Sequence, residues 1–254
     1  QWTGGLPGIF GIWWHRGFEG SIYAPYEGGV VRDYFAAIFA VLTKDVILEL
    51  RTKDILVSVM VFALLVIVIF NFALDPTPLT VALVAPGILW VAFLFGGVLG
   101  LNRSFAIEQD RGNLYGLMLA PVGRDVIFFG KLLGNFLFMV VVEAFIYPVF
   151  AVLFNLPIWI PGLLPIALLA TLGITTVGTA FSSMAINTRS REVMLPVLFF
   201  PVVVPVIVAA VEASGVMIRG DESAELTRWI PFLAVFDAIF LVVCPAAFSL
   251  VIEE

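Results

Sequence analysis

Long apolar runs separated by short polar stretches make up most of the chain. Six of these runs are long enough to cross the ~30 Å hydrocarbon layer of a bilayer as helices, which takes about 20 residues each. They cover residues 55–74, 79–101, 126–154, 163–186, 193–211 and 229–252. Apolar and polar residues do not alternate within them, so the ~10-residue alternating strands of a membrane barrel are excluded. The pattern predicts an all-α integral membrane protein with six transmembrane helices, whose backbone groups are satisfied within each span.

A shorter segment before the first span has a different pattern. Residues 34–53 carry apolar side chains at helical spacing with charged side chains among them. This pattern predicts an N-terminal interfacial amphipathic helix that lies in the lipid headgroups. Residues 1–33 are glycine-rich and show no periodicity, so we expect a poorly ordered extension there. Residues 34–254 are expected to form a single transmembrane permease domain.

Two spans depart from a simple straight helix. The third is longer than one crossing requires, so we expect part of it to emerge from the membrane on the side of Lys131. The fifth contains Pro196, Pro201 and Pro205, which predict a kinked or partly unwound helix. We expect residues 213–228 to form the one sizeable loop on the opposite side of the membrane.

Composition supports the membrane assignment. The 254 residues are 61% hydrophobic and 13% charged, whereas soluble domains have about 45–50% apolar and about 25% charged residues. A water-soluble globule is therefore excluded, and so is a disordered chain. The formal net charge of −6 gives no support for a nucleic-acid partner.

Basic residues are unevenly distributed between the two sides. One side holds nine of them and the other holds only Arg219 and Arg228. The nine are Lys44, Arg51, Lys53, Arg103, Arg111, Arg124, Lys131, Arg189 and Arg191. Because basic loops remain in the cytoplasm, this side is expected to be the inner one. With six spans, both termini are then cytoplasmic in a multi-pass protein of the bacterial-type inner (plasma) membrane.

The chain offers little for catalysis or metal binding. It has no G-x-x-x-x-G-K-[ST] phosphate-binding loop, no H-E-x-x-H and no G-x-S-x-G. His15 is its only histidine and Cys244 its only cysteine, so no metal or haem site can be built on several such ligands. We expect a non-catalytic protein with no metal site and no cofactor bound directly.

Two acids lie at membrane depth, Glu143 in the third span and Asp237 in the sixth. Such residues are costly in lipid and usually face the interior of the bundle with a partner. We expect protonation, or hydrogen bonds to polar side chains such as Asn71 or Thr175. The acids are either part of a transport path or gate, or structural groups that hold helices together. Thr171, Thr175, Thr179 and Ser183 recur every fourth residue and predict helix packing.

The inner connection at residues 101–125 is mixed in charge, with a helix break at Gly112 and a short amphipathic piece after it. A polar helix–turn–helix joined to two spans can transmit force from a soluble partner. An ordinary solvated loop has the same composition, and composition does not separate these two interpretations.

Several strings in this chain resemble the haem exporter protein B family (CcmB). They are A-P-G-I-L-W at 85–90, L-G-L-N-R-S-F-A at 99–106 and N-T-R-S-R-E-V-M-L-P at 187–196, with K-D-V-I-L-E-L-R-T-K at 44–53. The resemblance runs from about residue 34 to the C-terminal end. It implies an ABC-2-like permease architecture and the membrane subunit of an ATP-driven cytochrome c maturation complex.

The resemblance also implies where an ATPase binds. The family pattern F-x-x-D-x-x-D-G-x-L-E-x-L is matched by Phe105, Glu108, Gly112, Leu114 and Leu117, next to Asp110. Arg111 and Tyr115 replace the second and third acids of that pattern, so the charge complementarity of the contact is expected to differ. A second cytoplasmic contact is expected at Asn187, Arg189, Arg191 and Glu192, although basic residues there also serve orientation.

The implied partners are an ABC ATPase that binds ATP, a haem-handling membrane protein, a haem chaperone, membrane lipid and a second copy of the chain. Haem is the implied ligand, either moved outward or released on its chaperone outside the cytoplasm. Two alternatives remain open at this stage. One is an ABC-2-type exporter subunit for a lipid-linked glycan or drug, and the other is an ion-coupled secondary carrier that uses Glu143 and Asp237.

Overall fold

The computed structural model describes residues 30–74, 77–110, 123–160, 162–185, 191–220 and 224–251. Within these ranges the chain forms seven α-helices and no strand. The helices are α2 (Val30–Thr52), α3 (Asp54–Ala73), α4 (Pro78–Asp110), α6 (Arg124–Leu153), α7 (Leu163–Ala185), α8 (Arg191–Arg219) and α9 (Ala224–Val251).

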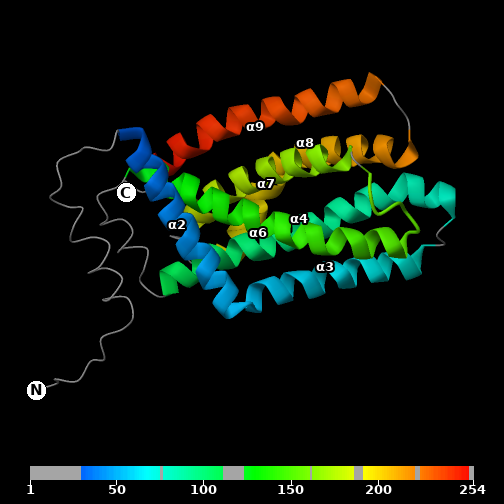
Figure 1. Ribbon diagram of the computed structural model, residues 1–254, viewed down its shortest axis with the longest axis horizontal. Coiled ribbons are helices and arrows are strands. Elements are labelled where there is room, and N and C mark those ends of the chain that lie inside the picture. The colour runs from blue at the N-terminus through cyan, green and yellow to red at the C-terminus, as the bar shows by residue number, and fades with distance from the viewer. Residues whose placement is uncertain are drawn as a thin grey trace, which may run out of the picture.

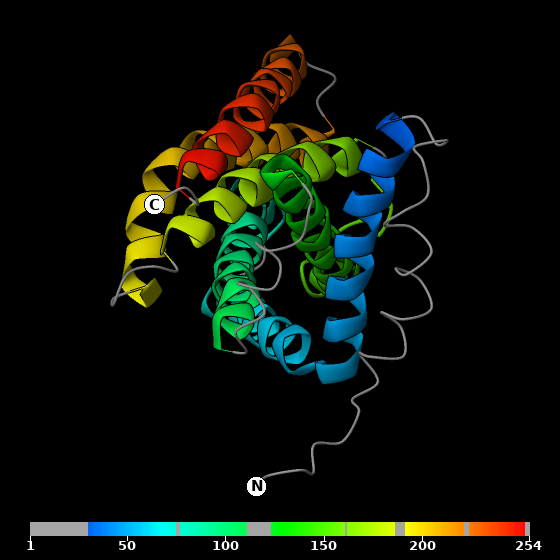
Figure 2. The same cartoon turned by 90° about the vertical axis from the view of Figure 1, so that its left-hand side faces the viewer.

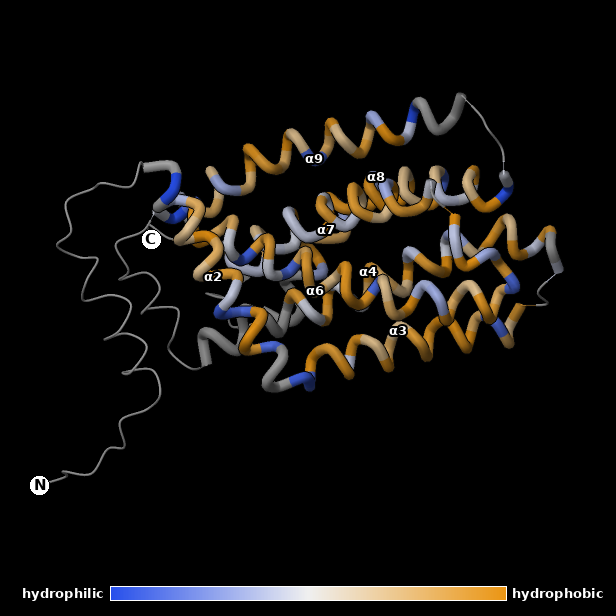
Figure 3. Tube along the Cα trace, in the orientation of Figure 1, coloured by the Kyte–Doolittle hydropathy of each residue, from blue (hydrophilic) through white to orange (hydrophobic). Residues whose placement is uncertain are grey.

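Six of the helices run side by side along the long axis of the molecule (Figure 1). Each contains a stretch that is long and apolar enough to cross a membrane, and the apolar residues extend over most of its length (Figure 3). These stretches are Asp54–Ala73, Leu79–Leu101, Arg124–Leu153, Leu163–Met184, Pro196–Arg219 and Arg228–Ser249. The six predicted spans are confirmed, and the chain is a multi-pass membrane protein.

Helix α7 occupies the middle of the bundle and packs against α4, α6, α8 and α9. Its neighbours supply a core of large apolar side chains that includes Trp90, Ile146, Phe199 and Val203. By contrast, outward-facing residues such as Val61 and Val242 are more than half exposed. A soluble protein rarely exposes so many apolar side chains together, and lipid is the solvent that fits this surface.

Helix α2 does not join the bundle but crosses one end of it (Figures 1 and 2). It begins four residues before the predicted start at residue 34 and ends at Thr52. Lys53 then takes a left-handed conformation with φ of 52°, which turns the chain sharply into α3. We call the end that α2 crosses the α2 end.

The fifth span was predicted to be kinked or partly unwound, and the unwound form is wrong. Helix α8 is helical from Arg191 to Arg219 although Pro196, Pro201 and Pro205 lie inside it. Pro201 and Pro205 are exposed, while residues such as Val203 and Val206 pack in the core. The rings of Pro201 and Pro205 therefore point away from the neighbouring helices, and core packing outweighs the lost backbone hydrogen bonds. The expected outer loop at 213–228 is also wrong, because helix continues to Arg219 and resumes at Ala224.

Candidate functional site

A line of polar contacts joins α6 to α7. Glu143 of α6 is only 7% exposed, and its carboxylate accepts a hydrogen bond from the Thr171 hydroxyl at 2.5 Å. Two turns away, the Asn135 side-chain amide donates to the Thr179 hydroxyl at 3.0 Å. The predicted packing role of the threonine stripe is confirmed, since buried hydroxyls on α7 satisfy polar groups on α6.

The expectation that a polar side chain satisfies Glu143 is confirmed, but the two residues suggested for it are wrong. Thr175 donates to the backbone of its own helix instead, with Thr171 O at 2.7 Å as the nearest acceptor. Asn71 lies near the end of α3 and donates to the backbone oxygen of Leu153 at 2.9 Å. Which hydroxyl on α7 faces Glu143 depends on the alignment of α6 with α7, which the amino-acid pattern does not contain.

Asp237 of α9 is in a different environment. It is 3% exposed, and neither carboxyl oxygen has a hydrogen-bond partner among the residues that the structure describes. It lies against α7 at Gly173, where an added Cβ atom would come within 2.6 Å of its Oδ1. Phe236 and Phe240 stack beside it on α9 with ring centroids 4.3 Å apart. Burying an unsatisfied polar group costs free energy. The position of Asp237 therefore gives the fold no evident stabilisation.

The structure does not bring the two acids together. Glu143 meets α7 at Thr171 and Asp237 meets it at Gly173. Each residue of an α-helix turns the direction of the side chain by about 100°, so side chains two positions apart differ by about 200° and face nearly opposite ways. The acids therefore lie at one level of the membrane but on opposite sides of α7.

An ion pair made by a buried lysine at the α2 end was not anticipated from the sequence. Lys131 of α6 is 1% exposed, and its ammonium lies 3.0 Å from the carboxylate of Asp45 on α2. Asp45 is also 3.2 Å from Lys44. Nearby, the Tyr34 hydroxyl donates to Asp125 at 2.7 Å, which gives α2 a second polar contact with α6. Partial burial and this hydrogen bond raise the pKa of Tyr34 to about 12.

The residues expected to bind an ATPase lie mostly outside the described ranges. Arg111, Gly112, Leu114, Leu117, Asn187 and Arg189 all fall there. Phe105, Glu108 and Asp110 continue helix α4 beyond its membrane span, and Arg191 and Glu192 begin α8. Figure 2 looks onto the α2 end, where α4 and α7 end and where α6 and α8 begin. Both expected contact segments therefore leave the bundle at the same end.

Comparisons with known proteins agree on one family. The family model of the CcmB protein matches residues 36–254, from within α2 to the last residue. Heme exporter protein B of Paracoccus denitrificans is 30% identical over 209 residues, covering 82% of this chain and 94% of the relative. The proteins of the same name from Rhodobacter capsulatus and Pseudomonas aeruginosa are 27% and 26% identical, again over 82% of this chain and over 94% and 92% of the relatives.

Proposed function

Because the chain belongs to the CcmB protein family, we propose that it is the membrane subunit of an ATP-driven haem-export complex. The six-helix permease-like bundle and the lack of a phosphate-binding loop in the sequence support this role. The chain is then a non-catalytic transporter subunit, and a separate ABC ATPase hydrolyses the ATP. The family match over nearly the whole chain is the observation that carries the proposal.

We place the ATPase contact at the α2 end. Phe105, Glu108, Asp110, Arg111, Gly112, Leu114 and Leu117 form the first contact, and Asn187, Arg189, Arg191 and Glu192 form the second. Support comes from the helix ends, because the segments that carry these residues leave the bundle at one end. Lys44, Lys53, Arg124 and Lys131 lie at that end, whereas Arg219 and Arg228 lie at the other. The charge asymmetry thus favours a cytoplasmic α2 end.

Haem is the proposed cargo, handled with a second membrane protein and a chaperone outside the cytoplasm. The only histidine of the chain is His15, so a stable haem site with two histidine ligands cannot form within one copy. This favours a role in releasing a loaded chaperone, or a transient passage of haem, over tight haem binding. A carrier driven by two cooperating acids has less support, because Glu143 and Asp237 lie on opposite sides of α7.

Co-purification with the ATPase tests the docking proposal. Phe105→Asp and Gly112→Pro should each abolish recovery of the ATPase with the tagged chain, while the chain itself stays in the membrane. Trp159→Asp is the matched control, because Trp159 is exposed at the opposite end of the bundle. ATPase recovery that survives both substitutions, or that is lost equally in the control, would contradict docking at the α2 end.

Substitution of the acids tests their proposed part in transport. Glu143→Gln and Asp237→Asn keep size and shape, so both proteins should accumulate in the membrane at normal levels. We expect each to lower cytochrome c maturation, measured by haem staining of the exported cytochrome. Maturation at the normal level in both variants would leave the acids as structural groups only.

A further inference from the structure

Helix α9 meets the rest of the bundle along one narrow line of side chains. Its membrane span is the least buried of the six. The buried side chains that the structure describes on α9 are Leu233, Asp237, Cys244 and Phe248. They are four, seven and four residues apart, which places them on one face of the helix. We call these four residues the α9 seam, and Asp237 is the acid among them.

The seam brings Asp237 to a point where α7 has no side chain. A Cβ atom at Gly173 would come within 2.6 Å of Asp237 Oδ1 and within 3.3 Å of the Phe236 ring. Towards the α2 end, Cys244 shares an apolar cluster with Ala180 of α7. The carboxyl group of Asp237 therefore lies against the backbone of α7, inside a contact that is otherwise apolar.

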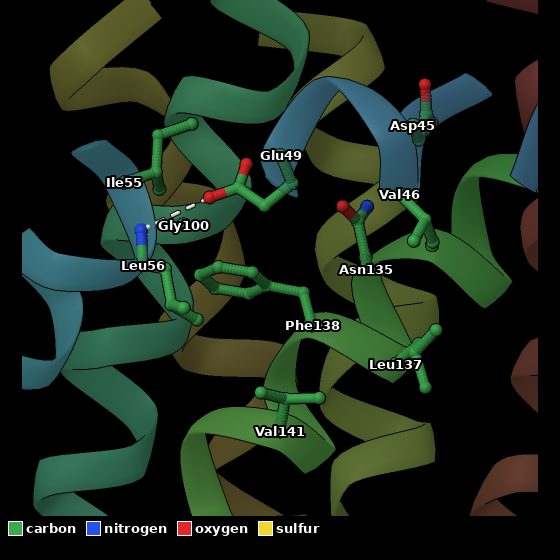
Figure 4. Close-up of a pocket in the computed structure, with 11 residues that line it drawn as sticks. Asp45, Val46, Glu49, Ile55, Leu56, Gly100, Asn135, Leu137, Phe138 and Val141 are labelled. Atoms are coloured by element: carbon green, nitrogen blue, oxygen red, sulfur yellow. Dashed lines mark hydrogen bonds between the residues drawn. The ribbon is translucent and has the colours of Figure 1, made fainter. Parts of the chain in front are cut away.

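Other carboxylates that lie between helices have hydrogen-bond donors. In the cavity under α2, Glu49 accepts the backbone N–H of Leu56 at 3.2 Å (Figure 4). In the middle of the bundle, Glu143 accepts the hydroxyl of Thr171. Both oxygens of Asp237 lack such a donor within the described ranges. Burial of an ionised carboxylate without a partner is far more costly than burial of the neutral acid, so the closed seam requires a protonated carboxyl.

In the described part of the bundle, the helices around Asp237 carry their basic residues near their ends. Asp237 is at the middle of α9, and α7 has no ionisable residue between 163 and 185. The other ionisable residues of the helices at the seam are Arg124, Asp125, Lys131, Glu143 and Tyr147 of α6, Arg191, Glu192, Glu212 and Arg219 of α8, and Glu225, Arg228 and Cys244 of α9. Apart from Glu143, each is within about two turns of a helix end, and Glu143 meets the opposite side of α7. An ionised Asp237 therefore needs water, which reaches it only if α9 moves away from α7.

We propose that Asp237 is a proton-binding latch that holds α9 on α7. While the carboxyl carries its proton, the seam stays closed. When the proton leaves to water, the negative charge requires hydration and α9 separates from α7. Protons then shift the population between the closed and the open seam, because only the closed seam excludes the charged form. The latch goes beyond the proposed export function, since it is a property of this chain with no ATPase present.

The native Cys244 reports whether the seam is open, because its thiol is 5% exposed and lies about two turns from Asp237. The experiment compares the native full-length chain with Asp237→Asn in proteoliposomes, and measures the rate at which a small methanethiosulfonate reagent modifies the thiol. Titration of the thiol itself is common to both proteins and cancels in the ratio of their rates. That ratio, native to variant, should rise about tenfold from weakly acidic to alkaline pH. A ratio that does not change with pH would overturn the proposal.

Glu143→Gln is the matched control, because the same change from acid to amide removes a buried carboxyl on the other side of α7. Its labelling should depend on pH as in the native chain. Loss of the pH dependence in this variant as well would indicate a general loosening of the bundle and overturn the latch.

Infrared spectroscopy gives a second readout that needs no movement of α9. The difference spectrum of the native chain minus Asp237→Asn at neutral pH should contain the C=O stretch of a protonated carboxyl. The band of an ionised carboxylate in its place would overturn the proposal. Failure of either test leaves the ATP-driven function untouched, because the ATPase takes no part.

Discussion

At the scale of single residues, the ion pair between Asp45 and Lys131 links α2 to α6 and can be tested by substitution. Asp45 is 15% exposed and also lies 3.2 Å from Lys44, so the loss of one partner weakens the compensation of the other charge and costs roughly 1–3 kcal/mol. We expect Asp45→Asn and Lys131→Met each to destabilise the protein by this order. The double variant should lose clearly less than the sum of the two. Unfolding in mixed micelles measures all three, and strictly additive losses would contradict a coupled pair.

The phenol of Tyr34 gives the residue scale a prediction about pH. Its pKa is raised from 10 to about 12, so the folded state favours the protonated phenol. The stability that this contributes is fully present below pH 10 and is lost as pH rises through 12. Absorbance at 295 nm, as the difference between the native chain and Tyr34→Phe, should therefore show a titration well above pH 10. A midpoint near 10 would contradict both the partial burial of Tyr34 and its hydrogen bond to Asp125.

At the scale of elements, the close approach of α2 to α6 depends on the lack of a side chain at Gly130. A Cβ atom there would come within 2.6 Å of Val41 Cβ on α2. We expect Gly130→Ala to cost about 1–3 kcal/mol of unfolding free energy, because the two backbones must separate. Gly87→Ala is the control, since no atom lies within 4 Å of its added Cβ, and alanine in a helix interior gains up to ~1 kcal/mol over glycine. Equal effects of the two substitutions would contradict close packing of α2.

The elements were largely predictable because the bilayer fixes how long an apolar run must be. The side-chain contacts between elements were not predictable, because they depend on how helices distant in the sequence align. Asp45 and Lys131 are 86 residues apart, and nothing in either local pattern points to the other. The outer end of α8 was missed for a related reason. Glu212 ends the apolar run, but Ser214 beyond it accepts a hydrogen bond from Trp90 of α4 and keeps this part of the helix in the core.

At the scale of the whole molecule, the orientation of the bundle decides whether an ATPase can reach its proposed contacts. Single cysteines at Lys53 and Gly220 mark opposite ends, because Lys53 joins α2 to α3 and Gly220 follows α8. In a Cys244→Ala background, an impermeant maleimide added to intact cells should label Gly220→Cys and not Lys53→Cys. Labelling of both in permeabilised cells is the control for reactivity. The reverse pattern would put Phe105 and Arg191 outside the cell, where no ATP-driven partner could act on them.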